Sequence, residues 1–167
     1  MKNNTLSIVL VLTLPIAAVI ALATPSSGFL LNQVIAMGTS LTNISQQVQI
    51  AGPNGEDPWQ LQVQAQGATD FYVNQLVIAP GGHSGWHSHP GVLIGAVTSG
   101  SIDFYDSNCR KRTVNAGEVY LENSEPHAII NNGTTNAELT IGFIVKRSAA
   151  RRIDESAPAC APATNIP

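Results

Sequence analysis

The sequence predicts an all-β protein, built as a sandwich or a barrel. Several short segments alternate apolar with polar side chains, and the clearest of them covers residues 137–146. Turn pairs such as Ser99-Gly100 and Asn132-Gly133 separate these segments at short intervals. No window has a helical period of comparable quality, so we expect many short strands in one domain.

The expected strands follow one another along the second half of the chain. Residues 60–66 alternate apolar residues with glutamine, which predicts a half-buried strand. Further strands are predicted at residues 71–78, 92–97, 102–105, 118–121, 127–131 and 137–146. Residues 33–36 and 48–50 also have strand-like composition. The glycine, serine and asparagine between them favour irregular chain instead.

The first residues have the pattern of an export signal. Lys2 supplies an early positive charge, residues 6–23 are almost entirely apolar, and Ala21-Leu22-Ala23 has the small-x-small form of a cleavage site. We therefore expect residues 1–23 to be an apolar signal helix that is removed. An apolar run of this length could also be retained as a membrane anchor. Either outcome places the domain outside the cytoplasm, secreted or periplasmic, with membrane contact only if the segment is retained.

The cysteine count agrees with that compartment. The chain contains two cysteines, Cys109 and Cys160, and such a pair usually oxidises outside the cytoplasm. We expect a disulfide that ties the Ala/Pro-rich tail to the domain. A redox-active pair or a thiolate metal site is the alternative, but there is no CxxC spacing and no nearby histidine.

The charge content argues against nucleic acid as a partner. Charged residues make up 11% of the chain and the formal net charge is -3. A protein that binds phosphate backbones needs a basic surface, which this composition does not provide. We therefore expect no nucleic-acid partner.

Three of the four histidines fall within residues 82–89. His87 and His89 are separated by one residue, so on a strand both imidazoles point to the same face and can bind one metal ion. Two ligands seldom hold a metal firmly, and a third must come from elsewhere in the chain. His127 is the histidine that remains outside this segment.

These residues resemble the first motif of the cupin superfamily. That motif reads Gly, five residues, His-x-His, three or four residues, Glu, six residues, Gly. Gly81, His87, His89 and Gly100 have this spacing, but Leu93 stands at the position of the glutamate.

The second cupin motif is matched less completely. It ends in a metal-binding histidine followed after three residues by asparagine, which is similar to His127 and Asn131. Its opening fits less well, because Gly117 stands one residue nearer the histidine than the pattern asks. Glu122 and Ser124 replace the proline and glycine of its middle.

The resemblance implies a double-stranded β-helix, or jelly-roll barrel, over residues 60–147. Residues 24–59 would form an N-terminal extension, partly irregular, and residues 148–167 a C-terminal tail tied back by the disulfide. The resemblance also implies one divalent metal ion, Fe, Mn, Zn, Cu or Ni, held by His87, His89 and His127.

Without the glutamate, three neutral imidazoles would leave the ion its full double charge. We therefore expect an anionic ligand at the open positions. Glu125 could replace the missing carboxylate and His83 could add an imidazole. Each also has an ordinary interpretation, as a turn residue beside Pro126 and as a solvated loop histidine.

Alternation along the strands also predicts what lines the pocket. Leu93, Val97 and Ile129 are expected to face inward beside the metal, and Phe143 to join them. Trp86 should point away from it. A metal at the base of an apolar pocket suits a small organic molecule with a carboxylate, phenolate or thiolate group.

Two classes of function follow from this arrangement. The first is a metal-dependent enzyme, an oxygenase or an isomerase, acting on a small anionic substrate. The alternative is a non-enzymatic module that binds a small ligand or a metal outside the cytoplasm, which the scarcity of acid and base groups favours. Apolar residues on both faces of residues 141–145 also predict a homodimer.

Overall fold

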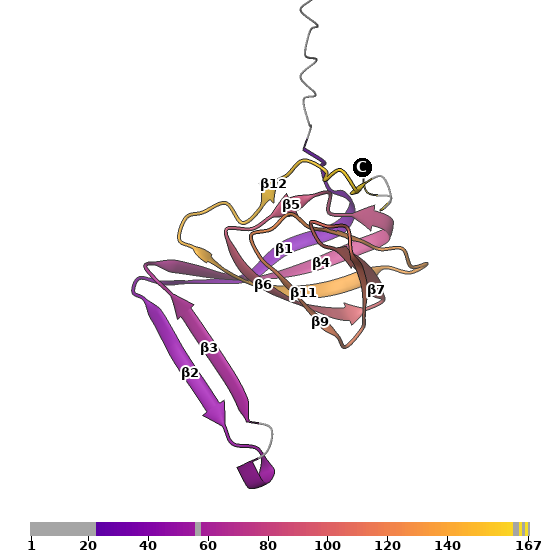
Figure 1. Ribbon diagram of the computed structural model, residues 1–167. Helices are drawn as coiled ribbons and strands as arrows, with labels where there is room; N and C mark the ends of the chain where they lie inside the picture. Colours follow the sequence, from indigo (N-terminus) through magenta and orange to yellow (C-terminus); the bar gives the residue numbers. More distant parts are fainter. Residues whose placement is uncertain (1–22, 56–57, 162–163, 165, 167) are drawn as a thin grey trace, which may run out of the picture.

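The computed structural model describes residues 23–55, 58–161, 164 and 166. Among these residues the chain is built mainly from strands, with a 3-10 turn, η1, at Pro53–Gly55 (Figure 1). The expected all-β fold is therefore present. The expected signal helix over residues 1–23 lies outside the described residues, Ala23 excepted. No described segment forms a helix with the length and apolar character that a membrane span requires.

The strands form one large antiparallel sheet and two small ones. In the large sheet the order is β8-β7-β10-β4-β11-β6-β9, and β1 also pairs with β4. The small sheets are β12-β5 and β2-β3. The bounds are β1 (Ser27–Ser40), β2 (Ile44–Ile50), β3 (Trp59–Ala65), β4 (Thr69–His83), β5 (His87–Ser88), β6 (Gly91–Ser99), β7 (Ser101–Tyr105), β8 (Lys111–Asn115), β9 (Val119–Glu122), β10 (Ala128–Ile130), β11 (Ala137–Lys146) and β12 (Ile153–Asp154).

The large sheet curls into a barrel around an apolar core (Figure 1). Strand β11 shows why, because its alternate residues Leu139, Ile141 and Phe143 are buried while the residues between them are more exposed. Burying one such side chain contributes about 1.5–3 kcal/mol. The inward faces of β4, β6 and β11 therefore form the wall against which the functional site is placed.

Residues 60–66 form a strand, as predicted, but their expected burial is wrong. Strand β3 pairs with β2 in a separate hairpin that projects away from the barrel (Figure 1). Leu61 is 47% exposed and Trp59 is 53% exposed. Alternation with glutamine predicts a strand with two different faces, but it does not determine which part of the molecule covers the apolar face.

The segment before this hairpin also differs from the expected, partly irregular extension. Strand β1 runs unbroken through Gly38 and pairs with β4 along most of its length, with register shifts near its start and between Val34 and Ala36. Glycine and serine are tolerated there because cross-strand hydrogen bonds to β4 hold the backbone. Residues 27–40 are therefore part of the barrel sheet.

The C-terminal segment crosses the end of the barrel, and residues 147–161 are called the strap below. Its strand β12 pairs with β5, and the amide of Glu155 donates to the carbonyl of Trp86 at 3.1 Å. The hydroxyl of Ser88 donates to the carboxylate of Glu155 at 2.6 Å. The strap therefore lies along the strand that carries the His-x-His pair.

The expected disulfide joins Cys109, after β7, to Cys160 at the end of the strap. An apolar cluster lies beneath it, with Trp86 fully buried at 0% exposure and Ala161 and Ile166 contributed by the tail. Trp86 thus packs against the tail. Covalent and apolar contacts together hold the strap in place.

Replacing both cysteines by serine should lower the free energy of unfolding by about 4 kcal/mol. The bridge closes a loop with a sequence separation of 51 residues, and the chain-entropy model gives about this value for such a loop. Denaturant unfolding of the wild type and the double variant measures the difference. A change below about 1 kcal/mol would show that the apolar cluster alone fixes the strap.

Candidate metal centre

Four buried side chains converge at the end of the barrel under the strap. They are His87 on β5, His89 just after it, Glu122 at the end of β9, and His127 just before β10. One ligand atom from each lies within 4.8 Å of all the others. None of the four residues is more than 5% exposed.

Backbone pairing brings the histidines together although they are far apart in the chain. His87 and His127 are joined by an antiparallel bridge, in which each backbone amide donates to the other's carbonyl, at 3.0 and 2.9 Å. Their ring centroids are 4.5 Å apart, and the ring of His89 lies 4.8 Å from that of His87. Glu122 is opposite Leu93 in the β6–β9 register, so its carboxylate faces inward as well.

The orientation of each imidazole is set by a backbone carbonyl. Nδ1 of His87 contacts the carbonyl of Gly85 at 3.1 Å, and Nδ1 of His127 that of Glu125 at 2.7 Å. Nδ1 of His89 contacts the carbonyl of Arg151 on the strap. A carbonyl oxygen can only accept, so each Nδ1 carries the proton. The Nε2 lone pairs are left pointing into the cluster.

These lone pairs have no proton donor to accept from. Nε2 of His89 lies 3.1 Å from Oε2 of Glu122, and Nε2 of His127 lies 3.4 Å from the same oxygen. Both nitrogen atoms are buried without a hydrogen-bond partner. Imidazole lone pairs facing a carboxylate repel it unless a cation lies between them. The donor set therefore fits a divalent metal ion bound by three nitrogen atoms and one oxygen.

The surroundings also keep the ligands in the metal-binding protonation state. Burial, helped by repulsion from His127, lowers the pKa of His87 to about 3. Burial alone would raise the pKa of Glu122, but in the metal-free protein the His127 and His89 imidazoles can also protonate at Nε2 and donate to its carboxylate, which outweighs burial and lowers that pKa. At neutral pH His87 is thus neutral and Glu122 is ionised.

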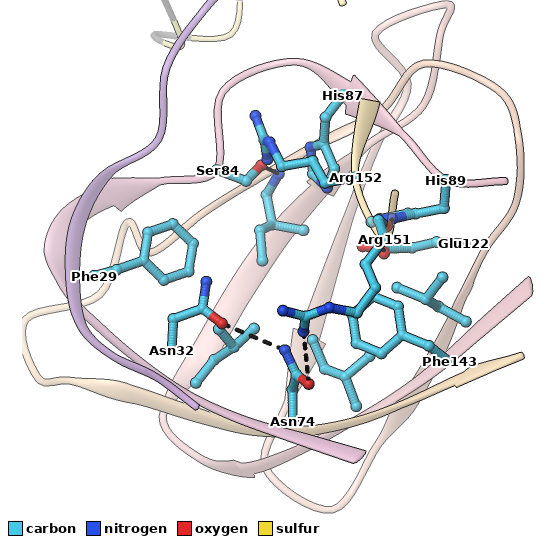
Figure 2. A pocket seen from close by; sticks show the side chains of 14 residues that line it. Phe29, Asn32, Asn74, Ser84, His87, His89, Glu122, Phe143, Arg151 and Arg152 are labelled. Carbon is cyan, nitrogen blue, oxygen red and sulfur yellow. Dashed lines mark hydrogen bonds and ion pairs between the residues drawn. The ribbon is translucent and has the colours of Figure 1, made fainter. Parts of the chain in front are cut away.

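The cluster lines a cavity of about 290 Å³ that opens beside the strap (Figure 2). Leu93, Ile129 and Phe143 line it, as expected from strand alternation, whereas Val97 is buried in the barrel core and does not reach it. Polar residues line it as well, and sequence reasoning had not assigned them: Asn32, Asn74, Ser84, Arg151 and Arg152.

A second cavity, of about 480 Å³, lies on the other side of the cluster. It shares Glu122 with the first cavity, and His127 and residues around β7, β9 and the loop before β10 line the rest of it. The side chain of Glu125 lines this second cavity, not the cluster. Glu125 reaches the site through its carbonyl, which holds His127.

The comparisons with known proteins agree with this architecture. Residues 74–143 match the family model described as Cupin domain. This part of the chain is a cupin domain. No relative was found among curated proteins.

Several solved cupin structures resemble parts of the chain. An oxalate oxidase in complex with the substrate analogue glycolate is 29% identical, over 44% of this chain and 41% of that chain, with a TM-score of 0.41. The chain thus spans less than half the length of that enzyme. A cupin-like protein from Thermotoga maritima is 22% identical, over 52% and 65% of the two chains, with a TM-score of 0.45. A double-stranded β-helix protein from Klebsiella pneumoniae is 16% identical, over 69% and 86%, with a TM-score of 0.44.

The sequence predicted a metal site without a carboxylate ligand, because the cupin glutamate is absent from its motif position, and this prediction is wrong. Leu93 does occupy the motif position, but Glu122 supplies a carboxylate from the facing strand β9. A bound divalent ion would therefore keep one net positive charge, not two. The alternation of β9 could have predicted this ligand, because Tyr120 and Glu122 are the two buried residues of the strand. A carboxylate at an inward position of an otherwise apolar strand indicates a ligand.

His83, the other alternative ligand, also lies outside the cluster. It ends β4, is half-buried, and its Nδ1 accepts from the amide of Gly85 at 3.2 Å. Gly85 has a φ of +65°, and a Cβ there would lie 2.0 Å from the carbonyl oxygen of Thr24. This turn fixes the Gly85 carbonyl that orients His87. His83 therefore contributes to the shape of the turn.

The metal-free protein should lose stability as the pH falls from about 7 to about 5. His87 has a pKa of about 3 when folded against 6.5 as its reference, so in this window the unfolded chain binds more protons. Stability is present above the unfolded pKa and falls by about 2 kcal/mol over these two pH units. Denaturant titrations in a chelator measure it. His87→Gln should reduce this slope, and an unchanged slope would contradict the assignment.

Proposed function

We propose that this protein is an exported, metal-dependent enzyme that acts on a small anionic organic molecule. The observation that carries the proposal is the convergence of three imidazole lone pairs and one carboxylate at the wall of a cavity. His87, His89, Glu122 and His127 would hold one divalent ion. Fe, Mn, Zn, Cu and Ni all accept this donor set.

The volume and the lining of the cavity fit a small, negatively charged substrate. Its volume of about 290 Å³ is at the lower end of the range for ligand pockets, about 300–1,000 Å³. The wall near Leu93, Ile129 and Phe143 is apolar, and two arginines bring positive charge. A small molecule with an apolar part and an acidic group matches these surfaces.

The chemistry of the wall favours an oxygenase over an isomerase. When bound, the metal would offer a Lewis-acidic and, for iron or manganese, redox-active centre to substrate and dioxygen. Isomerisation usually needs a general base within hydrogen-bond reach of the substrate. Among the described residues that line the cavity, Glu122 faces the histidines and the Ser84 hydroxyl already donates to the carbonyl of Gly85 at 2.8 Å. An oxidation at the metal fits these residues best, because it does not need one of them to act as a general base.

A binding module without turnover is the second candidate. The same scarcity of acid and base groups in the cavity supports it. The hydroxyl of Tyr120 does not add such a group, because it is buried, has no hydrogen-bond partner and does not line the cavity. Turnover discriminates between the two candidates, because both require the metal and the ligand to bind.

The proposed export rests on two features of the chain. The N-terminal residues have the pattern of a signal segment, and Cys109 and Cys160 form a disulfide. Disulfides persist in oxidising compartments. The homodimer inferred from the sequence stays a prediction, which light scattering of the purified protein tests.

The purified protein should contain one equivalent of a divalent metal by mass spectrometry. When it is loaded with iron or manganese, it should consume dioxygen in the presence of small carboxylates. Metal without oxygen consumption for any carboxylate, phenol or thiol would favour the binding module. Absence of metal binding at neutral pH would contradict both candidates.

Glu122→Gln should weaken metal binding by more than about 100-fold. Loss of even an outer partner of a metal ligand typically costs about 10–100-fold in affinity, and here a charged ligand is removed while the shape is kept. Competition with a chelator of known affinity measures the change. Glu125→Gln is the matched control, since only its backbone contacts the cluster. Equal affinities for the two variants would remove Glu122 from the ligand set.

A further inference from the structure

Arg152 lines the cavity and has a guanidinium nitrogen without a hydrogen-bond partner. The residue lies on the strap, its side chain is 31% exposed, and it lines the same cavity as His87 (Figure 2). Its Nε pairs with Oδ1 of Asp154 at 2.5 Å. Its Nη2 is buried and has no hydrogen-bond partner. Leaving such a donor unsatisfied costs about 1–3 kcal/mol, and more for a charged group.

The neighbouring arginine is already engaged. One Nη of Arg151 donates to Oδ1 of Asn74 at 3.1 Å (Figure 2). Its guanidinium also lies 5.3 Å from the centre of the Tyr72 ring. The charged residues that line the cavity are these two arginines and Glu122, which faces the histidines. Arg152 differs in that one of its guanidinium nitrogen atoms has no hydrogen-bond partner, although Asp154 neutralises part of its charge.

The backbone fixes Arg152 relative to the metal ligands. The residues that follow it form β12, in which Ile153 pairs with Ser88 and Asp154 with His87. The carbonyl of Arg151, just before it, accepts a hydrogen bond from Nδ1 of His89. A ligand that contacts Arg152 therefore meets the histidine cluster at a set position.

We propose that Arg152 binds a carboxylate of the ligand while a second acidic group of the same molecule binds the metal. The ligand class is then a small dicarboxylate. This inference rests on the proposed function, because it requires a metal in the cluster. The strap lies outside the His-x-His segment in the sequence, and on this proposal it determines the specificity for dicarboxylates.

Isothermal titration calorimetry of the zinc-loaded protein tests the proposal, because zinc binds ligands without redox turnover. Malonate and succinate should bind about tenfold or more tightly than propionate and butyrate, since a charge-assisted hydrogen bond adds about this factor. Arg152→Gln should remove the difference between the two acid series while the variant still binds zinc. Arg152→Lys should restore part of it.

Arg112→Gln is the matched control, because Arg112 is exposed and donates to the carbonyl of Val119, away from the cavity. It should retain the preference for dicarboxylates. Equal affinity of the wild type for both acid series, or a preference that survives in Arg152→Gln, overturns the inference while the metal site stands. Failure of the wild type to bind zinc would instead overturn the proposed function.

Discussion

Three hydrogen bonds from histidine Nδ1 atoms to backbone carbonyls are the constraint on which the site depends. An imidazole that is free to rotate can present either nitrogen atom, and its tautomer follows its surroundings. Here the carbonyls of Gly85, Glu125 and Arg151 fix each ring, so all three Nε2 lone pairs face one point. These carbonyls belong to three different segments, and the barrel and the strap must both be in place before the lone pairs converge.

The metal-ligand residues lower the stability of the fold, because they are polar groups buried inside it. A carboxylate and three imidazoles are buried together, and burial without compensation is costly. The apolar face of β11 and the cluster around Trp86 lie on either side of the site and supply the burial that offsets this cost. The mutual bridge between His87 and His127 adds backbone hydrogen bonds at the same place.

The sequence was sufficient for the features that depend on local pattern. The period of β11 predicted its buried face, and the spacing of His87 and His89 predicted that their rings share a side. It was insufficient wherever a partner from a distant segment decides the outcome. Glu122 stands outside the usual motif position and reaches the cluster through the β6–β9 register. The apolar residues of β3 alternate like those of a barrel strand, yet β3 pairs with β2 away from the barrel. Arg152 reaches the cavity through the β12–β5 pairing. Strands of two residues are too short to have a sequence pattern that predicts this pairing.

The four residues of the cluster line two different cavities: His87 and His89 line the first, His127 lines the second, and Glu122 lines both. Glu122 therefore belongs to the wall of both cavities, one beside the strap and one beside the loop that precedes β10. An ion held by these four residues would border both cavities. An organic molecule anchored in the first cavity would leave the second as a separate entrance, through which water or a dissolved gas could arrive without displacing it.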